Sequence, residues 1–288
     1  MRIDDKSLLV SVVLTTYNRK DLLKETINSI LDQTYQNFEL IVIDNYSDYD
    51  FYSHIKLFND HRIRAFQNTN NGIISINRNY GIKLAMGKYV AFCDDDDLWV
   101  ENKLEEQLKK INEHNVDMVF SVAKHFGSID IFSDIYGLYP IPFNVKVATN
   151  ELLTMNTIIF SSVVLKKEIL DKHDGFNIKQ TYMGIEDYDL WLRVSKTSSI
   201  IFMPNIHVFY RIHPNMTQLN NPMKDVGLKE LYKEHGGQYI YRTFSPSRHI
   251  LLRLLRSLYH KFVEILIMLK FFEIKLFKSK FIKMEVNT

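Results

Sequence analysis

The first hundred residues alternate strand patterns with helical patterns, and this alternation constrains the fold more than any other feature of the chain. Apolar, β-branched runs predict strands over residues 8–15, 38–43, 62–66 and 89–92. Apolar residues at helical spacing predict helices over residues 18–30, 75–86 and 97–112. Such strand–helix–strand units predict an α/β fold with a doubly wound, mostly parallel sheet.

The second half of the chain is less regular. It predicts strands over residues 116–123, 157–165 and 208–212 and an amphipathic helix over 186–195. Residues 128–148 hold two prolines and several aromatic residues, and we expect an irregular loop or hairpin there. In doubly wound sheets the ligand binds beyond the carboxyl ends of the strands. Polar residues that follow the strands are therefore the candidates for a site.

Four consecutive aspartates, Asp94–Asp97, follow the strand at 89–92. Their like charges repel one another unless a cation offsets them. Two carboxylates together with phosphate oxygens are common ligands of Mg²⁺ or Mn²⁺. The alternative is a solvated acidic turn at the start of the next helix, where negative charge suits the helix dipole. Taken alone, the acidic run fits both interpretations.

Three further candidates lie after the other strands. Asp44 ends the strand at 38–43, and its carboxylate can accept a hydrogen bond from a nucleobase, on which Tyr17 can stack. Arg78 lies in the helix at 75–86 and can pair with phosphate. A turn aspartate, a packed tyrosine and a surface arginine are the alternative interpretations.

Glu186-Asp187 and His213 are the candidates in the second half. A carboxylate can remove the proton from an attacking hydroxyl group, although Glu186-Asp187 also suits the N-terminal cap of the helix at 186–195. His213, as a neutral imidazole, can complete a metal or phosphate site.

Five segments of the chain carry a family resemblance. They are Val10-Ser-Val-Val-Leu-Thr-Thr-Tyr-Asn-Arg19, Leu40-Ile-Val-Ile-Asp-Asn45, Asn77-Arg-Asn-Tyr-Gly81, Phe92-Cys-Asp-Asp-Asp-Asp-Leu-Trp99 and Glu186-Asp-Tyr-Asp-Leu-Trp-Leu-Arg193. In this order they closely resemble the family 2 glycosyltransferases of the GT-A fold, over about residues 8–217. Members of the bacterial surface-polysaccharide type are the nearest parallel.

The resemblance implies an inverting transferase with a nucleotide-diphosphate-sugar donor, taken here as a UDP-sugar, and a Mn²⁺ or Mg²⁺ cofactor. The donor-binding residues it implies are Thr15, Tyr17, Arg19, Asp44, Arg78, Asp94 and Asp95. Asp187 is the implied catalytic base, and Asp96 and His213 are the implied metal ligands. Asp95 stands where relatives often carry a small residue, so the pair of carboxylates that faces the cation stays open.

The chain is expected to divide into three parts, the first two from the resemblance and the third from its charge and apolar spacing. Residues 1–100 are expected to form the nucleotide-sugar-binding half of the GT-A domain, and residues 101–220 the acceptor-binding half. Residues 221–288 are expected to form a basic, amphipathic helical tail.

The tail concentrates positive charge. Residues 242–284 hold ten lysines and arginines against two glutamates, a net charge of +8 in a chain whose total is +2. Leucine, isoleucine and phenylalanine recur there at helical spacing, while charged residues interrupt every apolar stretch. This pattern excludes a membrane-spanning helix and favours a helix lying on an anionic membrane surface. The alternatives are packing against the protein's own body or against a second subunit in a homodimer.

The body carries net negative charge, so no nucleic-acid partner is expected. Residues 1–6 lack the apolar core of a secretion signal, so we expect a cytoplasmic protein at the inner face of the cell membrane, acting on a lipid-linked or polysaccharide acceptor. The competing functions are a nucleotidyltransferase of sugar phosphates, which the absence of glycine from residues 15–19 disfavours, and a non-catalytic nucleotide-sugar-binding protein.

Overall fold

The computed structural model describes residues 8–127, 135–136, 149–153, 156–213 and 224–236. Apart from Ile135, these residues belong to one compact unit. The basic tail at 242–284 and most of the expected loop at 128–148 lie outside the described residues.

The first half folds as the alternation predicts. Its elements are β1 (Val10–Thr16), α1 (Lys20–Leu31), β2 (Phe38–Asp44), α2 (Phe51–Lys56), β3 (Ile63–Gln67), α3 (Ile74–Leu84) and β4 (Tyr89–Asp94). The four strands are parallel, with β1 between β2 and β4 and with β3 beyond β2. In this register Thr15 pairs with both Ile43 and Asp94, so the three strands end together.

The second half extends the same sheet. Its elements are β5 (Leu98–Trp99), α4 (Lys103–His114), β6 (Met118–Gly127), β7 (Ile135–Tyr136), α5 (Thr149–Leu152), the 3-10 turn η2 (Phe160–Ser162), β8 (Val164–Lys166), α6 (Lys167–Lys172), the 3-10 turn η3 (Gln180–Tyr182), α7 (Glu186–Ser195), β9 (Ile200–Ile212) and α9 (Lys224–His235). Along the described strands the order is β3-β2-β1-β4-β8-β6-β9-β5. β8 runs antiparallel to β4 and β6, while β6 and β9 are parallel.

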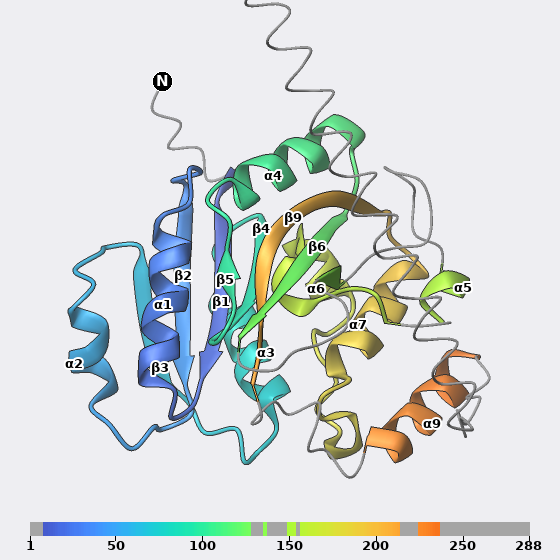
Figure 1. The fold of residues 1–288 in the computed structure, drawn as a ribbon. Helices are drawn as coiled ribbons and strands as arrows, with labels where there is room; N and C mark the ends of the chain where they lie inside the picture. Colours follow the sequence, from blue (N-terminus) through green and yellow to red (C-terminus); the bar gives the residue numbers. More distant parts are fainter. Residues whose placement is uncertain (1–7, 128–134, 137–148, 154–155, 214–223, 237–288) are drawn as a thin grey trace, which may run out of the picture. The chain divides into compact units, whose positions relative to one another are not determined.

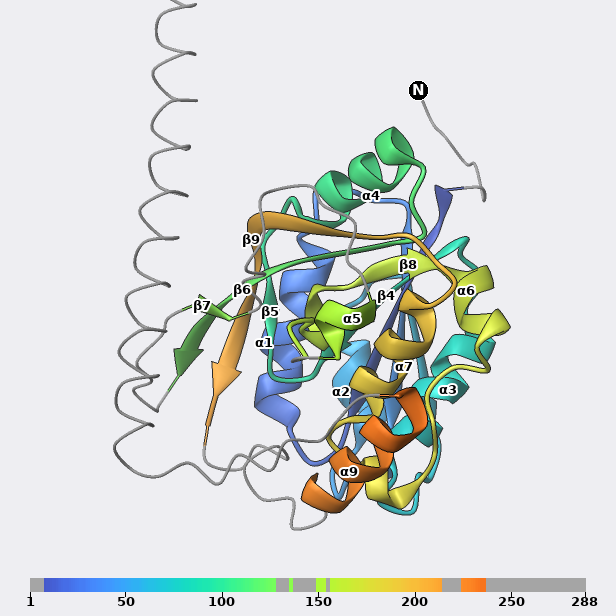
Figure 2. The same ribbon diagram turned by 90° about the vertical axis from the view of Figure 1, so that its right-hand side faces the viewer.

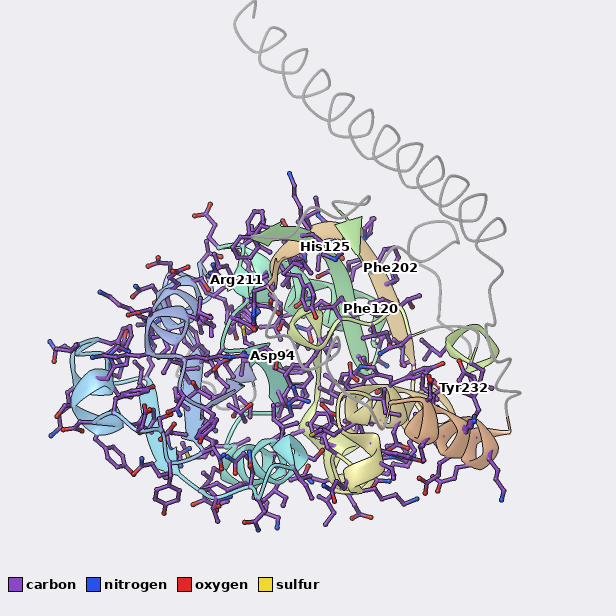
Figure 3. All side chains as sticks on the ribbon, turned by 60° about the horizontal axis from the view of Figure 1, so that its bottom comes forward. Asp94, Phe120, His125, Phe202, Arg211 and Tyr232 are labelled. Atoms are coloured by element: carbon purple, nitrogen blue, oxygen red, sulfur yellow. The ribbon has the colours of Figure 1, made fainter. Side chains whose placement is uncertain are left out.

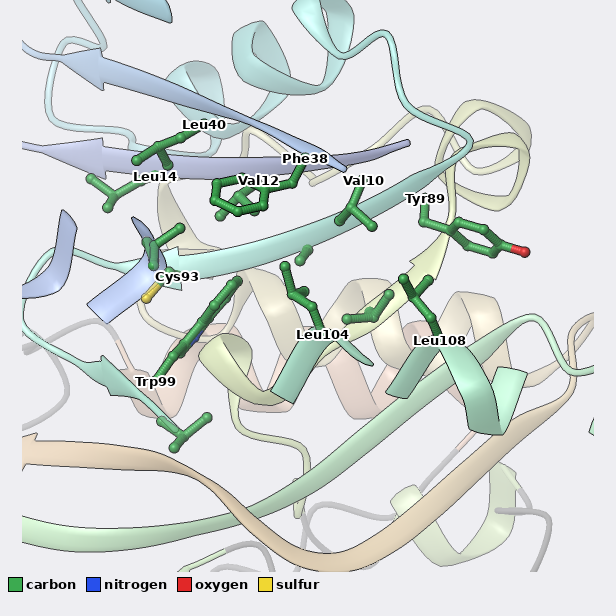
Figure 4. Packing of buried hydrophobic residues seen from close by; sticks show 14 of the residues in the cluster. Val10, Val12, Leu14, Phe38, Leu40, Tyr89, Cys93, Trp99, Leu104 and Leu108 are labelled. Carbon is green, nitrogen blue, oxygen red and sulfur yellow. The ribbon is translucent and has the colours of Figure 1, made fainter. Parts of the chain in front are cut away.

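Helices cover both faces of the sheet, as Figure 1 shows, with α1 on one side and α3 on the other. Val12 and Leu14 belong to the buried cluster that includes Leu23 and Ile27 of α1 and Trp99 (Figure 4). Val13 points to the opposite face of β1, toward α3. It lies so close to Gly81 of α3 that a Cβ there would be 2.5 Å from the Val13 Cγ1. The prediction of a doubly wound, mostly parallel α/β sheet is confirmed.

The expected helix over residues 97–112 is wrong in part, because it begins only at Lys103. Leu98 and Trp99 instead pair with β9 as strand β5. The Trp99 indole N–H also donates to the carbonyl of Ser161, at 3.0 Å, which holds this segment against the sheet. Asp97 is consequently not a helix cap.

The buried face of α3 also differs from the one that its apolar residues suggest. The helix buries Ser75, Asn77, Arg78, Gly81 and Ile82, a largely polar set. Burying a polar side chain is unfavourable unless it finds a hydrogen-bond partner. Asn77 has such a partner in Asn68, with which it forms hydrogen bonds of 2.7 and 2.9 Å. Helical periodicity cannot detect such a face.

The strands of the second half differ from their predicted bounds. The run at 157–165 forms a 3-10 turn and then only the short strand β8. β9 is much longer than 208–212, since it starts at Ile200 and passes an irregularity in its pairing with β6. α7 spans the predicted residues.

Candidate active site

A cavity of about 450 Å³ opens at the carboxyl ends of β1 and β4. Its lining includes the expected residues Thr15, Tyr17, Arg19, Arg78, Asp94, Asp95, Asp96 and Asp187. Arg211 of β9 also lines it, although β8 and β6 separate β9 from β4 in the sheet (Arg211 and Asp94 are labelled in Figure 3). The fold therefore brings together residues that are up to about two hundred positions apart, where a doubly wound sheet binds its ligand.

The four aspartates have different partners. Asp94 pairs with Arg78 at 2.8 Å, and Asp95 accepts hydrogen bonds from the Thr16 hydroxyl at 2.7 Å and from Arg19 at 2.8 Å. Arg19 also pairs with Asp96 at 2.8 Å. Two arginines thus offset the charge of the first three carboxylates.

Asp97 points away from this cavity. It is fully buried and accepts hydrogen bonds from the Ser161 hydroxyl at 2.5 Å and the Arg211 backbone N–H at 3.0 Å. Burial, and then the charges of Asp96 and Asp94, raise its pKa well above the usual range. Asp97 is a structural link between η2 and β9.

Burial also raises the pKa values of carboxylates that face the cavity. Burial raises the pKa of Asp95 to about 6, against the opposing effect of Arg19 and with a further contribution from Asp96. Burial raises the pKa of Asp94 too, and Arg78 opposes that shift. The site therefore stores unfavourable negative charge that a bound cation would relieve.

Arg78 is buried, not a surface residue. Its two terminal nitrogens pair with Asp94 at 2.8 Å and with Glu186 at 2.5 Å. Its guanidinium lies over the Phe160 ring, 3.7 Å from the centroid. Arg78 thus joins the end of β4 to the start of α7.

Glu186 and Asp187 open α7 but do not cap it. The N-cap residue is Ile185, and no side chain caps the helix there. Asp187 accepts a hydrogen bond from the Tyr188 backbone N–H at 2.7 Å, and the Asn156 amide lies 3.5 Å from its other oxygen. Burial, then the charge of Glu186, raise the pKa of Asp187 to about 7, against the effect of Arg78. A carboxyl group of this kind can exchange a proton near neutral pH.

The nucleoside side of the site differs from expectation at Asp44. Its carboxylate is fully buried and accepts hydrogen bonds from the Ser47 backbone and hydroxyl and from Gln67, at 2.5–3.0 Å. The neighbouring Asn45 lines the cavity in its place. Tyr17 is 54% exposed there, and the Thr15 hydroxyl is buried without a hydrogen-bond partner among the described residues.

His213 lies beside Asp96, with Nε2 2.9 Å from Oδ2. Within the part of the chain that the structure describes, no group of three or more His, Cys, Asp or Glu side chains is arranged to hold a metal ion. Asp96 and His213 supply two donors, which suits a cation whose remaining ligands come from phosphate oxygens and water.

Sequence reasoning missed Glu186 as the partner of Arg78, and it missed Asn156 and Arg211. Arg211 donates from Nε to the Asp96 carbonyl at 2.8 Å and pairs with Glu25 of α1. Nothing in the sequence signals these contacts, because they join residues that are 31 positions apart for Asn156 and Asp187 and more than one hundred apart for the two arginines.

The chain is similar to known glycosyltransferases. The protein-family model described as "Glycosyl transferase family 2" matches residues 11–174, which is more than half of the chain. An Escherichia coli protein, "UDP-Glc:alpha-D-GlcNAc-diphosphoundecaprenol beta-1,3-glucosyltransferase WfaP", is 31% identical over 231 residues, which cover 77% of this chain and 88% of that protein. A second one from Escherichia coli, of the same description but named WfgD, is 31% identical over 194 residues, 67% of this chain and 72% of its own.

Two solved structures have a similar fold. TarS 1–349 from S. aureus, in complex with UDP-GlcNAc, superposes with a TM-score of 0.65 at 18% identity, covering 79% of this chain and 65% of that one. The mannosyltransferase PcManGT from Pyrobaculum calidifontis, with GDP-Man and Mn²⁺, has a TM-score of 0.59 at 17% identity, covering 78% and 63%. This likeness confirms the GT-A architecture.

The buried Arg78 pairing predicts a stability effect. Glu186→Ala leaves Arg78 short of one of its two carboxylate partners, and breaking a buried pair costs roughly 3–5 kcal/mol. We expect the free energy of unfolding, measured by urea denaturation at pH 7, to fall by about 3 kcal/mol. Glu113→Ala, which removes a half-exposed partner of Lys109, is the control and should cost under about 1 kcal/mol. Equal losses in the two variants would contradict the structural role of Glu186.

Proposed function

The chain belongs to glycosyl transferase family 2, and from this membership and the cavity we propose that it moves a sugar from a UDP-sugar to a hydroxyl group of a lipid-linked saccharide, with inversion at the anomeric carbon. The observation that carries the proposal is one cavity with two chemically distinct sides. Asp94, Asp95 and Asp96 line it from the end of β4, and Asp187 lines it from α7.

Asp187 is the base in this proposal. Its carboxylate accepts the proton of the acceptor hydroxyl while that oxygen attacks the anomeric carbon and the bond to the diphosphate breaks. One displacement from the side opposite the leaving group inverts the configuration. Arg78 and Glu186 hold the start of α7, so the base is positioned by buried contacts and not by a surface loop.

The donor lies on the β1–β2–β4 side. Tyr17 offers an exposed ring for the nucleobase, and the buried Thr15 hydroxyl is free to bond to the nucleoside. Asp44 acts by fixing the loop that places Asn45 in the cavity. Arg19 faces Asp95 and Asp96, from which it can reach the diphosphate.

The donor set fits a divalent cation shared with the diphosphate. Asp96 and His213 would hold Mn²⁺ or Mg²⁺, and the ion would supply positive charge that stabilises the departing diphosphate. Arg78 and Asp94 remain on the donor side and keep the acidic run in place.

The acceptor follows from the relatives. Two of them are described as acting on alpha-D-GlcNAc-diphosphoundecaprenol, and a lipid-linked acceptor would suit a basic tail at residues 242–284 that lies on the inner face of the cell membrane. In the described residues no helix has the length and apolar character needed to cross a bilayer.

A donor panel tests the function. With a GlcNAc-diphosphate-lipid acceptor and Mn²⁺ or Mg²⁺, we expect nucleotide release from a UDP-sugar that depends on the acceptor, and none from GDP- or dTDP-sugars. The anomeric configuration of the product, determined by NMR, checks inversion. Retention, or release from GDP-sugars alone, would overturn the proposal.

Asp187→Asn tests the base. The amide cannot take up the proton, so we expect kcat to fall by at least about a hundredfold. The Kd for UDP should stay within about threefold, because Asp187 contacts the acceptor and not the nucleotide. Turnover close to that of the wild type would exclude Asp187 as the base.

The raised pKa of Asp187 sets the pH range in which activity is expected to change. The base works only when deprotonated, so kcat/KM should fall as the pH drops through about 7. In Asp187→Asn the residual rate should lose this limb of the profile.

Asp96→Ala tests the metal. We expect the Mn²⁺ concentration for half-maximal donor binding to rise by at least about tenfold, measured by calorimetry with UDP. Asp97→Asn is the matched control, since Asp97 does not line the cavity. Unchanged cation dependence in Asp96→Ala would contradict the assignment.

A truncation tests the membrane contact. The full chain should float with vesicles rich in anionic lipid, and a chain ending at Thr243 should not. Added salt should release the full chain, because about ten basic residues carry the attraction. A monomer–dimer change on truncation, without loss of lipid binding, would instead support a subunit contact.

A further inference from the structure

Helix α9 lies beyond residues 11–174, where the family match ends, and packs beside the segment that carries the base (Figure 2). No residue of α9 is among those that line the cavity. Its hydrogen bonds fall instead on both sides of the stretch Met183–Asp187, which lines the cavity at every residue but Ile185. Within the stretch, Gly227 of α9 lies close to the Ile185 side chain.

Before this stretch, α9 holds the turn η3. Glu230 accepts a hydrogen bond from the Thr181 hydroxyl at 2.8 Å, and Glu234 accepts one from the Tyr182 hydroxyl at 2.7 Å. The backbone of α9 comes so close that a Cβ on Gly227 would lie 2.0 Å from the Thr181 carbonyl oxygen. Only glycine permits this approach.

After the stretch, α9 holds the first turn of α7. The hydroxyl groups of Tyr232 and Tyr188 lie 3.2 Å apart, and their rings meet edge to face (Tyr232 is labelled in Figure 3). His235 Nε2 lies 3.0 Å from Asp189, a carboxylate that is 1% exposed and also pairs with Arg193. Tyr188 is the residue next to Asp187.

Met183–Ile185 lie between η3 and α7, while Glu186 and Asp187 begin α7, where Arg78 pairs with Glu186. Between η3 and α7 the internal backbone hydrogen bonds are those of single turns, and Gly184 adopts a left-handed φ of 81°. A segment with few bonds of its own moves unless neighbouring elements restrain it. α9 contacts it at both ends.

We propose that α9 is a positioning element for the proposed base: by gripping Thr181 and Tyr182 on one side and Tyr188 and Asp189 on the other, it keeps Asp187 at the distance that proton transfer needs. The inference rests on the proposed function for its catalytic consequence. Small displacements of a catalytic group cost large factors in rate, so a helix outside the cavity controls kcat.

Gly227→Ala in the full chain tests the proposal. The added methyl group meets the Thr181 carbonyl and separates α9 from η3, although alanine is the better helix former. We expect hydrogen exchange at the amides of residues 184–188 to accelerate by about tenfold or more. We also expect kcat for transfer from a UDP-sugar to fall by about tenfold or more, with KM for the donor within twofold of the wild type.

Val226→Ala is the matched control, because its side chain is 49% exposed on the same helix. Unchanged hydrogen exchange and unchanged kcat in Gly227→Ala would overturn the proposal. A donor KM that rises by the same factor as kcat falls would also overturn it. If Gly227→Ala does not fold, the variant that joins Glu230→Ala to Glu234→Ala decides by the same measurements.

The two proposals fail in different ways. A wild-type chain that transfers no sugar in the donor panel counts against the proposed function. The exchange measurement needs no substrate, so it still decides whether α9 restrains the segment.

Discussion

The site depends on the placement of positive charge among buried carboxylates. Asp94 ends β4 and Glu186 begins α7, and each pairs with Arg78, which is 4% exposed. Without that arginine the buried Glu186 carboxylate would lie near a second negative charge with no cation between them, which is unfavourable. The ring of Phe160 lies against the guanidinium, 3.7 Å from the centroid. Arg78 therefore links the end of β4 to the start of α7 by two ion pairs at the wall of the cavity.

A second arginine, Arg19, makes similar pairs with the neighbouring carboxylates of the site. Arg19 repeats the arrangement for Asp95 and Asp96, but it is more exposed than Arg78, with 29% of its side chain accessible. An exposed arginine exchanges partners more readily than a buried one. The two arginines therefore differ in exposure, since Arg78 is nearly buried between its partners and Arg19 is partly open to the cavity.

The acidic run illustrates how far local sequence reasoning reaches. A metal site and a helix cap were the alternatives for Asp94–Asp97, and the structure assigns different environments to its members. Asp94, Asp95 and Asp96 line the cavity, while Asp97 serves neither purpose and bonds to Ser161 and Arg211. The partners of Asp97 are 64 and 114 positions away, so neither alternative could be decided from neighbouring residues.

α3 and the segment after the acidic run show why some predictions were wrong. Periodicity assumes that a helix buries apolar residues, but α3 buries Asn77, which bonds to Asn68 in the loop before the helix, and Arg78, which pairs with Asp94 and Glu186. Leu98 and Trp99 pair with β9 and form a strand instead of the expected helix. For Arg78 and for this strand, the partners come from elements far away in the sequence.

Residue spacing was enough to predict the parallel sheet, and the motifs were enough to predict the family and eight of the residues that line the cavity. Strand and helix periods are local, and residues that follow parallel strands must meet at one edge of the sheet. Tertiary structure alone decided that Arg78 is buried between two carboxylates, that Asp44 turns away from the cavity and that α9 contacts both sides of Asp187. Burial and charge pairing depend on which distant segments come together, and that information is not carried by the spacing of residues along the chain.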